Sequence, residues 1–221
     1  ATADDSGLSA VDGLTRIATP NFIGNAEAGS SVEVFADGNS LGTTTADGVG
    51  AWSFTVQEDD AFNDGSFAIT AASTDAAGNT SGLSSALTIT VETSAPVFSA
   101  ATHQIVIDEN IGANQVVYTA QASDSSAVSY SLKSGLEDDA ADFSIDGSSG
   151  AVTLNLDPDY ETKEAYSFVV VATDAAGNSS EQTVSLSIND IDETAPNAPS
   201  GIDLATADDS GLSAVDGLTR I

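Results

Sequence analysis

A 17-residue string that occurs twice constrains this 221-residue chain more than any other feature. Residues 1–17 recur without a change as residues 205–221, an offset of 205 − 1 = 204 residues. Identity over that length does not arise by chance, so we expect the chain to be a piece of a longer protein that repeats a unit of 204 residues. In such arrays each structural unit mainly contacts its neighbours.

A weaker internal similarity divides the repeating unit into two parts. Residues 73–79 match residues 172–178 at six of seven positions, an offset of 172 − 73 = 99 residues. Each copy is followed by a strand-like run and a proline-containing linker. We therefore expect two domains, residues 1–95 and residues 96–196, followed by residues 197–221 as a linker and the start of the next repeat.

The hydrophobic pattern predicts an all-β chain. Runs rich in Val, Ile, Thr and Phe are separated by Gly, Asn, Asp and Ser turns roughly every 8–12 residues, and no long amphipathic helix is present. The expected strands are 31–36, 51–56, 66–73 and 85–92, then 104–107, 115–122, 128–132, 151–154, 166–172 and 182–188. Asp37-Gly38 and Asp146-Gly147 suit hairpin turns that need positive φ. We predict two tandem β-sandwiches in an elongated arrangement.

The charge balance limits the possible partners. The chain has 34 Asp and Glu against 4 Lys and Arg, a formal net charge of −30. Such a surface repels nucleic-acid phosphates and anionic membranes, so we expect neither as a partner, and no apolar run is long enough to insert into a bilayer. Acid-rich chains can be disordered, but 41% of these residues are hydrophobic and they alternate, which favours folded domains. There is no Cys to cross-link the fold.

The expected sandwich topology gathers the carboxylates of the second domain at its two ends. Successive strands run in opposite directions, so alternate loops meet at the same pole. The C-terminal pole then receives Glu109, Asp159, Glu161, Asp190, Asp192 and Glu193, and the N-terminal pole receives Asp124 and Asp174. Calcium takes about 6–8 oxygen ligands from such loops, and clustered carboxylates repel one another without a cation. We expect Ca²⁺ at these poles; the alternative is an acidic surface that is merely solvated.

The second domain contains four motifs in order: Asp108-Glu109-Asn110, residues 156–161, residues 171–174 and residues 190–196. Through these motifs it resembles a cadherin repeat over nearly its whole length. Two residues are inserted in the second motif, so Asp157 and Asp159 both remain candidates for its first ligand. Ser126 stands where the second acid of an Asp-x-Asp segment would follow Asp124. The resemblance implies calcium bound between consecutive domains, with fewer or weaker sites at the N-terminal pole.

The first domain contains four short motifs, at residues 5–13, 22–30, 50–54 and 74–79. Through them it resembles the bacterial immunoglobulin-like repeats of giant RTX-type adhesins that leave Gram-negative cells by type I secretion. By the same loop rule we expect Asp75 at the N-terminal pole of this domain, with the loop that carries Asp5 and Asp12 entering there. Glu92, in the linker, completes the candidate calcium ligands. An Ig-like domain followed by a cadherin-like domain, repeated in tandem, resembles the extender region of these adhesins.

These observations favour a structural role. The leading hypothesis is a monomeric, extracellular spacer on a bacterial surface, of the kind that serves adhesion and biofilms, which contacts neighbouring repeats of its own chain and is stiffened by calcium. The alternative is a ligand-binding or homophilic adhesion module for a sugar or protein, although the alternating pattern around Trp52, the sole Trp, indicates core packing. We expect no enzyme, because His103 is the sole His and no nucleophile motif is present.

Overall fold

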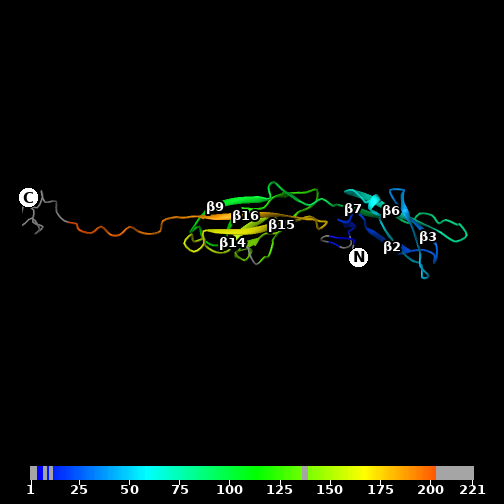
Figure 1. Ribbon diagram of the computed structural model, residues 1–221, viewed down its shortest axis with the longest axis horizontal. Coiled ribbons are helices and arrows are strands. Elements are labelled where there is room, and N and C mark those ends of the chain that lie inside the picture. Colours follow the sequence, from blue (N-terminus) through cyan, green and yellow to red (C-terminus); the bar gives the residue numbers. More distant parts are fainter. Residues whose placement is uncertain (1–3, 7–8, 10–11, 136–138, 203–221) are drawn as a thin grey trace, which may run out of the picture. The chain divides into compact units, whose positions relative to one another are not determined.

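The chain folds into β-strands, as predicted. The computed structural model describes residues 4–6, 9, 12–135 and 139–202. Ala1–Asp190 forms one compact unit, which contains two β-sandwiches, and Ile191–Ile221 forms a second unit. In the described part, the helical elements are two short 3₁₀ turns, η1 (Glu58–Asp60) and η2 (Ala140–Asp142), and everything else that is regular is strand (Figure 1). The all-β fold class is therefore confirmed.

The first sandwich packs a five-stranded sheet, in the order β1-β7-β6-β3-β4, against the pair β2-β5. The core between them includes Phe22, Val34, Phe54 and Ile89. β1 pairs in parallel with the end of β7, whereas the other neighbours are antiparallel. The strands are β1 (Leu14–Thr15), β2 (Asn21–Asn25), β3 (Ser31–Ala36), β4 (Asn39–Thr45), β5 (Ala51–Thr55), β6 (Gly65–Thr74) and β7 (Leu87–Val91).

The second sandwich packs the sheet β12-β15-β16-β9 against the sheet β10-β14-β13, with β8 and β11 as a separate pair. Burial alternates along β16, so that Gln182, Val184, Leu186 and Ile188 are buried while the residues between them face outward. The strands are β8 (Val97–Phe98), β9 (Thr102–Asp108), β10 (Gln115–Thr119), β11 (Ala122–Ser123), β12 (Ser129–Leu132), β13 (Phe143–Ile145), β14 (Ala151–Leu154), β15 (Ala165–Thr173) and β16 (Ser179–Asn189).

The two predicted hairpin turns differ in outcome. Between β3 and β4, Asp37 has φ 49° and Gly38 has φ 82°, as the sequence predicts. Between β13 and β14 the prediction of positive φ at Asp146-Gly147 is wrong, because the left-handed residue is Gly150, with φ 73°. Asp146 instead accepts hydrogen bonds from the backbone N–H groups of Ser148 and Ser149 and so closes a longer loop.

Gly50 in the first sandwich and Gly150 in the second make the same close contact. A Cβ on Gly50, whose φ is +87°, would lie 2.5 Å from the Ala26 carbonyl oxygen, and a Cβ on Gly150 would lie 2.5 Å from that of Ala120. Each glycine carbonyl also accepts the N–H of the same alanine, at 2.8 and 2.9 Å. The two sandwiches therefore share a tight turn that a side chain would break.

Gly50→Ala is expected to lower the free energy of unfolding of the first sandwich by more than about 1 kcal/mol, because alanine would be both strained at positive φ and too close to a carbonyl. Urea unfolding followed by the fluorescence of Trp52 measures this. Gly48→Ala is the matched control, since a Cβ there meets nothing within 4 Å. Equal stability of the two variants would show that the turn is not under this constraint.

Candidate functional site

One cluster of carboxylates joins the two sandwiches. Glu92 directly follows β7 of the first sandwich, while Asp124 and Asp174 follow β11 and β15 of the second. One carboxylate oxygen from each lies within 4.8 Å of the other two. Glu92 is 6% exposed and Asp174 is fully buried. We call these three residues the junction triad; it brings together residues that the sequence predicted as ligands.

Hydrogen bonds hold the members of the junction triad in place. The Asn178 side-chain amide donates both to the Glu92 carbonyl and to Asp174 Oδ2, each at 2.8 Å, so it links the two sandwiches. The Ser125 hydroxyl donates to Glu92 Oε1, and Ser126 donates to Asp124 Oδ1 through both its N–H and its hydroxyl. Among the described residues, the ion pairs involve Lys133 and Lys163 and no member of the triad.

Further contacts across the same junction come from Ser6, ahead of β1, and from Arg16, directly after it. The Ser6 hydroxyl donates to the Ala176 carbonyl at 3.0 Å, and Arg16 Nη1 donates to the Gly177 carbonyl at 2.6 Å. Both acceptors lie in the turn that Asp174 and Asn178 close. The junction triad is therefore bordered by contacts that run from one sandwich to the other.

A second cluster lies at the opposite end of the second sandwich. Glu109, Glu161 and Asp190 each place one carboxylate oxygen within 4.8 Å of the other two. Glu109 is 2% exposed and its Oε2 accepts the Tyr160 N–H at 2.8 Å, whereas Glu161 and Asp190 are exposed. We call this cluster the distal triad. It groups three of the six acids that the sequence predicted for this pole.

The other three predicted acids of this pole lie outside the distal triad. Asp159 accepts from the Thr162 N–H and hydroxyl and so caps its own turn. The competing candidate, Asp157, accepts the Gly112 N–H at 2.8 Å. Asp192 accepts the Thr194 N–H at 2.9 Å and, with Glu193, belongs to the second unit. Whether Asp157 or Asp159 is a ligand stays a prediction, as does the role of Asp192 and Glu193.

The predicted grouping of Asp75 with Asp5 and Asp12 is wrong. Asp75 follows the end of β6 that pairs with Ser31, whereas the opposite end of β6 pairs with Val91, beside Glu92. The Asp5 loop folds back on β1, where the Ser6 N–H donates to the Leu14 carbonyl, and β1 lies against the end of β7. Asp5 and Asp12 therefore lie on the junction side, because the loop ahead of β1 doubles back instead of entering from the far end.

Asp75 and Asp174 occupy the same turn in their two sandwiches. The Asn79 N–H and side-chain amide donate to Asp75 at 2.8 and 2.7 Å, and Asn178 does the same to Asp174 at 2.8 Å. The hydrogen bonds from Asn79 lower the pKa of the Asp75 carboxyl below its ordinary value. Asp75 belongs to neither triad, so the turn alone does not make a cluster. Asp174 is in one because Asp124 of its own sandwich and Glu92 of the other lie beside it.

Asp64 is a junction residue that the sequence reasoning missed. Its Oδ1 accepts the Thr93 N–H at 2.7 Å and the Thr93 hydroxyl at 2.6 Å, and its Oδ2 accepts the Ser94 hydroxyl at 2.7 Å. The hydrogen bond from the Thr93 hydroxyl is the main cause that lowers the pKa of Asp64. The linker after Glu92 is thus tied to the first sandwich. An isolated Asp between Asn63 and Gly65 reads as an ordinary turn, so no sequence pattern signals this contact.

The two triads have the chemistry of a hard-cation site. Carboxylate oxygens are the preferred ligands of Ca²⁺. Three carboxylates this close together repel one another, and a divalent cation among them reverses the sign of that interaction. Glu92 and Asp174 are largely withdrawn from water, and the repulsion between buried charges is screened less than that between exposed charges. The donor set therefore fits calcium, and these acidic clusters could hold ions.

Two protein families match consecutive parts of the chain. Residues 1–93 match the bacterial Ig-like domain, and residues 103–189 match the cadherin domain. The chain thus contains a bacterial Ig-like domain followed by a cadherin domain, as the sequence resemblances implied. Cadherin domains typically bind calcium, serve in general as adhesion or spacer modules, and are in general not enzymes.

Individual relatives match slightly less than half of the chain. Cadherin EGF LAG seven-pass G-type receptor 3 of Mus musculus is 32% identical over 108 residues, which cover 46% of this chain and 3% of that protein. Protein dachsous of Drosophila melanogaster gives the same identity and the same coverage of 46% and 3%. The chain therefore spans only a small fraction of the length of the curated relatives it matches.

Solved structures of cadherin domains are also similar. The protocadherin gamma B2 extracellular cadherin domains 3–6 give a TM-score of 0.45 at 15% identity, covering 85% of this chain and 55% of that chain. The third cadherin domain of human protocadherin 7 gives a TM-score of 0.40 at 20% identity, covering 46% of this chain and 92% of that chain. Within the described residues, we find no helix with the length and apolar character needed to cross a membrane.

Proposed function

We propose that this chain is a calcium-stiffened spacer from a tandem array on a bacterial cell surface. The observation that carries the proposal is the composition of the junction triad, in which Glu92 comes from the Ig-like domain and Asp124 and Asp174 come from the cadherin domain. An ion held by all three would tie the two domains together. The array would then project a distal binding domain from an RTX-type adhesin, as an extracellular monomer that contacts neighbouring repeats.

The stiffening follows from electrostatics. Without a cation, the like charges of the junction triad favour separation of the domains. The hydrogen bonds across the junction, from Asn178 to the Glu92 carbonyl and from Ser6 and Arg16 to the turn after β15, oppose it. With calcium bound, separating the domains would expose a cation stripped of part of its ligand set. Extracellular calcium modules bind with a Kd of about 10⁻⁴–10⁻³ M, so low-millimolar calcium would select the stiff state.

The distal triad extends the same arrangement to the next junction. Glu109, Glu161 and Asp190 supply ligands at the end of the cadherin domain. We propose that Asp192 and Glu193, which follow immediately, add ligands there, as the resemblance to the cadherin linker motif implies. The acids Asp208, Asp209 and Asp216 of the repeated string, which the sequence suggests as further neighbours, lie outside the described residues.

Calorimetric titration of the chain with calcium tests the proposal. We expect wild type to bind calcium with a Kd within about 10⁻⁴–10⁻³ M, Glu92→Gln to lose the binding that belongs to the junction triad, and Glu109→Gln to lose that of the distal triad. Glu27→Gln, an exposed acid outside both triads, is the control. No heat and no uptake by wild type in several millimolar calcium would reject the proposal.

A further inference from the structure

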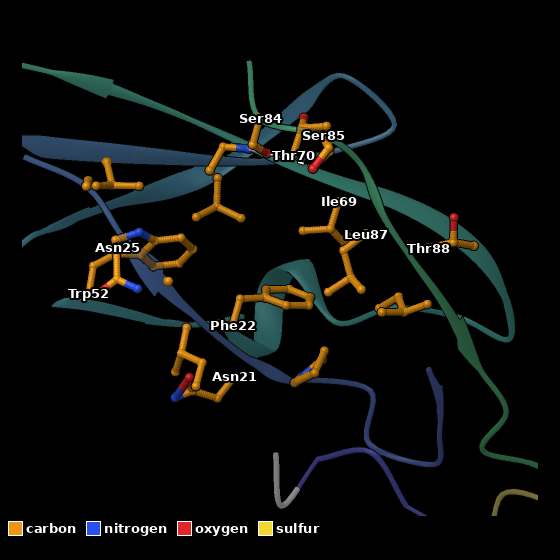
Figure 2. Close-up of a pocket in the computed structure, with 18 of the residues that line it drawn as sticks. Asn21, Phe22, Asn25, Trp52, Ile69, Thr70, Ser84, Ser85, Leu87 and Thr88 are labelled. Atoms are coloured by element: carbon orange, nitrogen blue, oxygen red, sulfur yellow. Dashed lines mark hydrogen bonds between the residues drawn. The ribbon is translucent and has the colours of Figure 1, made fainter. Parts of the chain in front are cut away.

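The Ig-like domain has an open apolar groove between its two sheets. The groove has a volume of ≈ 860 Å³ and extends along β2 on one side and along β6 and β7 on the other. Figure 2 shows Phe22, Trp52, Ile69 and Leu87 directed into it. Leu87 is 54% exposed, so the groove leaves a large apolar side chain in contact with water. Apolar surface of this kind commonly marks a place where another chain segment binds.

One wall of the groove is a strand edge that can accept a further strand. Among the described residues, β2 pairs with β5 alone. On the β5 side, the Pro20 carbonyl accepts the Val56 N–H and the Ala26 N–H donates to Gly50, so the even-numbered residues of β2 face β5. The odd-numbered residues, Ile23 among them, therefore direct their backbone N–H and C=O groups toward the groove. Unpaired edges of this kind are templates for strand addition.

Asp4 identifies which part of the sequence leads into the groove. Its Oδ2 accepts the Asn21 N–H at 2.6 Å, at the beginning of β2, and Asp4 itself lines one end of the groove. A chain segment that runs up to Asp4 along β2 would therefore be antiparallel to β2. In the repeated string Asp208 corresponds to Asp4, since 208 − 4 = 204, and the residues that lead into that string are 197–204.

Residues 197–204 have the composition of the missing strand. Their sequence is Asn-Ala-Pro-Ser-Gly-Ile-Asp-Leu, in which Ile202 and Leu204 alternate with polar or small residues, a pattern typical of a half-buried strand. Ile202 is 89% exposed in its own unit. Pro199 lacks a donor N–H and suits the beginning of an added strand. Residues 200–204, if extended, span about 16 Å, which equals the length of the five-residue β2, and residues 205–207 would then connect this strand to Asp208.

We propose that the groove of the Ig-like domain binds residues 197–204 of a second copy of this chain as a β-strand antiparallel to β2, with Ile202 and Leu204 in the apolar interior. In a tandem array the same segment would come from the preceding repeat. Each Ig-like domain would then be completed by the residues that follow the preceding cadherin domain. The groove lies in the Ig-like domain and the donor segment follows the cadherin domain, so copies of the chain should associate head to tail. Such contacts are heterologous, so they build rings or open chains and not a two-fold symmetric dimer.

A peptide of residues 197–207 tests the groove directly, because Trp52 is the sole Trp and lines it. Added to the full chain, the peptide should change the Trp52 fluorescence saturably. The same peptide with Ile202→Asp and Leu204→Asp should bind at least about tenfold more weakly, because both apolar anchors are lost. Equal binding of the two peptides, or no response to either, would overturn the proposal.

Complementary variants of the full chain test the second copy as the donor. By sedimentation equilibrium, the mass of wild type should rise with concentration, and it should do so in chelator as well as in calcium. The chain with Ile202→Asp and Leu204→Asp lacks the donor, and the chain with Leu87→Asp lacks the acceptor. Each should stay monomeric alone, and an equimolar mixture should form a 1:1 dimer. Leu87 and Ile202 are exposed, and unchanged melting temperatures of both variants verify the fold.

Three outcomes would contradict the head-to-tail contact. Peptide binding by a wild-type chain that stays monomeric at all concentrations would mean that the chain's own segment fills the groove. Association that disappears in chelator would assign it to the acidic triads instead of to the groove. Association of the chain with Ile202→Asp and Leu204→Asp as strong as that of wild type would show that this segment is not the donor.

Discussion

In 10 mM calcium, Asp174→Asn is expected to melt at a lower temperature than wild type, although the two should melt within a few degrees of each other in chelator. Asp174 is fully buried in the junction triad, and its two oxygens accept from Asn178. Asparagine keeps one acceptor but removes a charge that calcium needs. At 10 mM calcium and a Kd of about 10⁻⁴–10⁻³ M, one bound ion adds about 1.4–2.7 kcal/mol of stability, which the variant would lose.

Asp75→Asn is the control for Asp174→Asn. Asp75 has the same turn and the same hydrogen bonds from an Asn four residues later, but it lies outside both triads. It should therefore keep the full calcium-induced rise in melting temperature. If Asp75→Asn lost as much of that rise as Asp174→Asn, the effect would belong to the turn and not to the junction triad.

Phe168→Ala is expected to destabilise the cadherin domain by about 3–5 kcal/mol, the usual cost of removing a fully buried aromatic ring. Phe168 is 0% exposed at the centre of β15, and its ring centroid lies 4.4 Å from that of Phe143. Since a domain has only about 5–15 kcal/mol of stability in total, this single change removes much of it. Urea unfolding followed by circular dichroism measures the loss.

Two comparisons make the Phe168→Ala result specific. Ser167→Ala, on the outward face of the same strand, should change stability by less than about 0.5 kcal/mol. The fluorescence of Trp52 reports the Ig-like domain alone, so its transition should stay near that of wild type in Phe168→Ala. A loss below about 1 kcal/mol in the cadherin domain would contradict the packing described for this core.

Strands in which apolar and polar residues alternate strongly were predictable from the sequence. The predicted strands 31–36 and 151–154 coincide with β3 and β14, and the runs at 166–172 and 182–188 lie inside β15 and β16. β2 and β4 were missed because Asn and Gly occupy several of their positions, which weakens the apolar pattern. These strands are specified by tertiary packing, such as that of the Trp52 ring over Gly24.

The candidate site was predictable where the rule that alternate loops meet at the same pole applies. This rule placed Glu109, Glu161 and Asp190 together, and Asp124 with Asp174, and the structure groups them in that way. The rule failed for Asp5 and Asp12. It assumes that a loop continues in the direction of its strand, whereas the loop ahead of β1 turns back. No rule based on one domain could indicate the partnership of Glu92 with Asp174, since that depends on how two domains meet.

We propose that calcium fixes the two domains relative to each other through the junction triad. Small-angle X-ray scattering of several repeats in tandem, titrated from excess chelator to several millimolar calcium, tests it most directly. We expect a rise in maximum dimension toward the summed domain lengths, and a much smaller rise for Glu92→Gln in every repeat. Unchanged dimensions of wild type across the titration would contradict it, and the acids would then serve only to keep the surface hydrated.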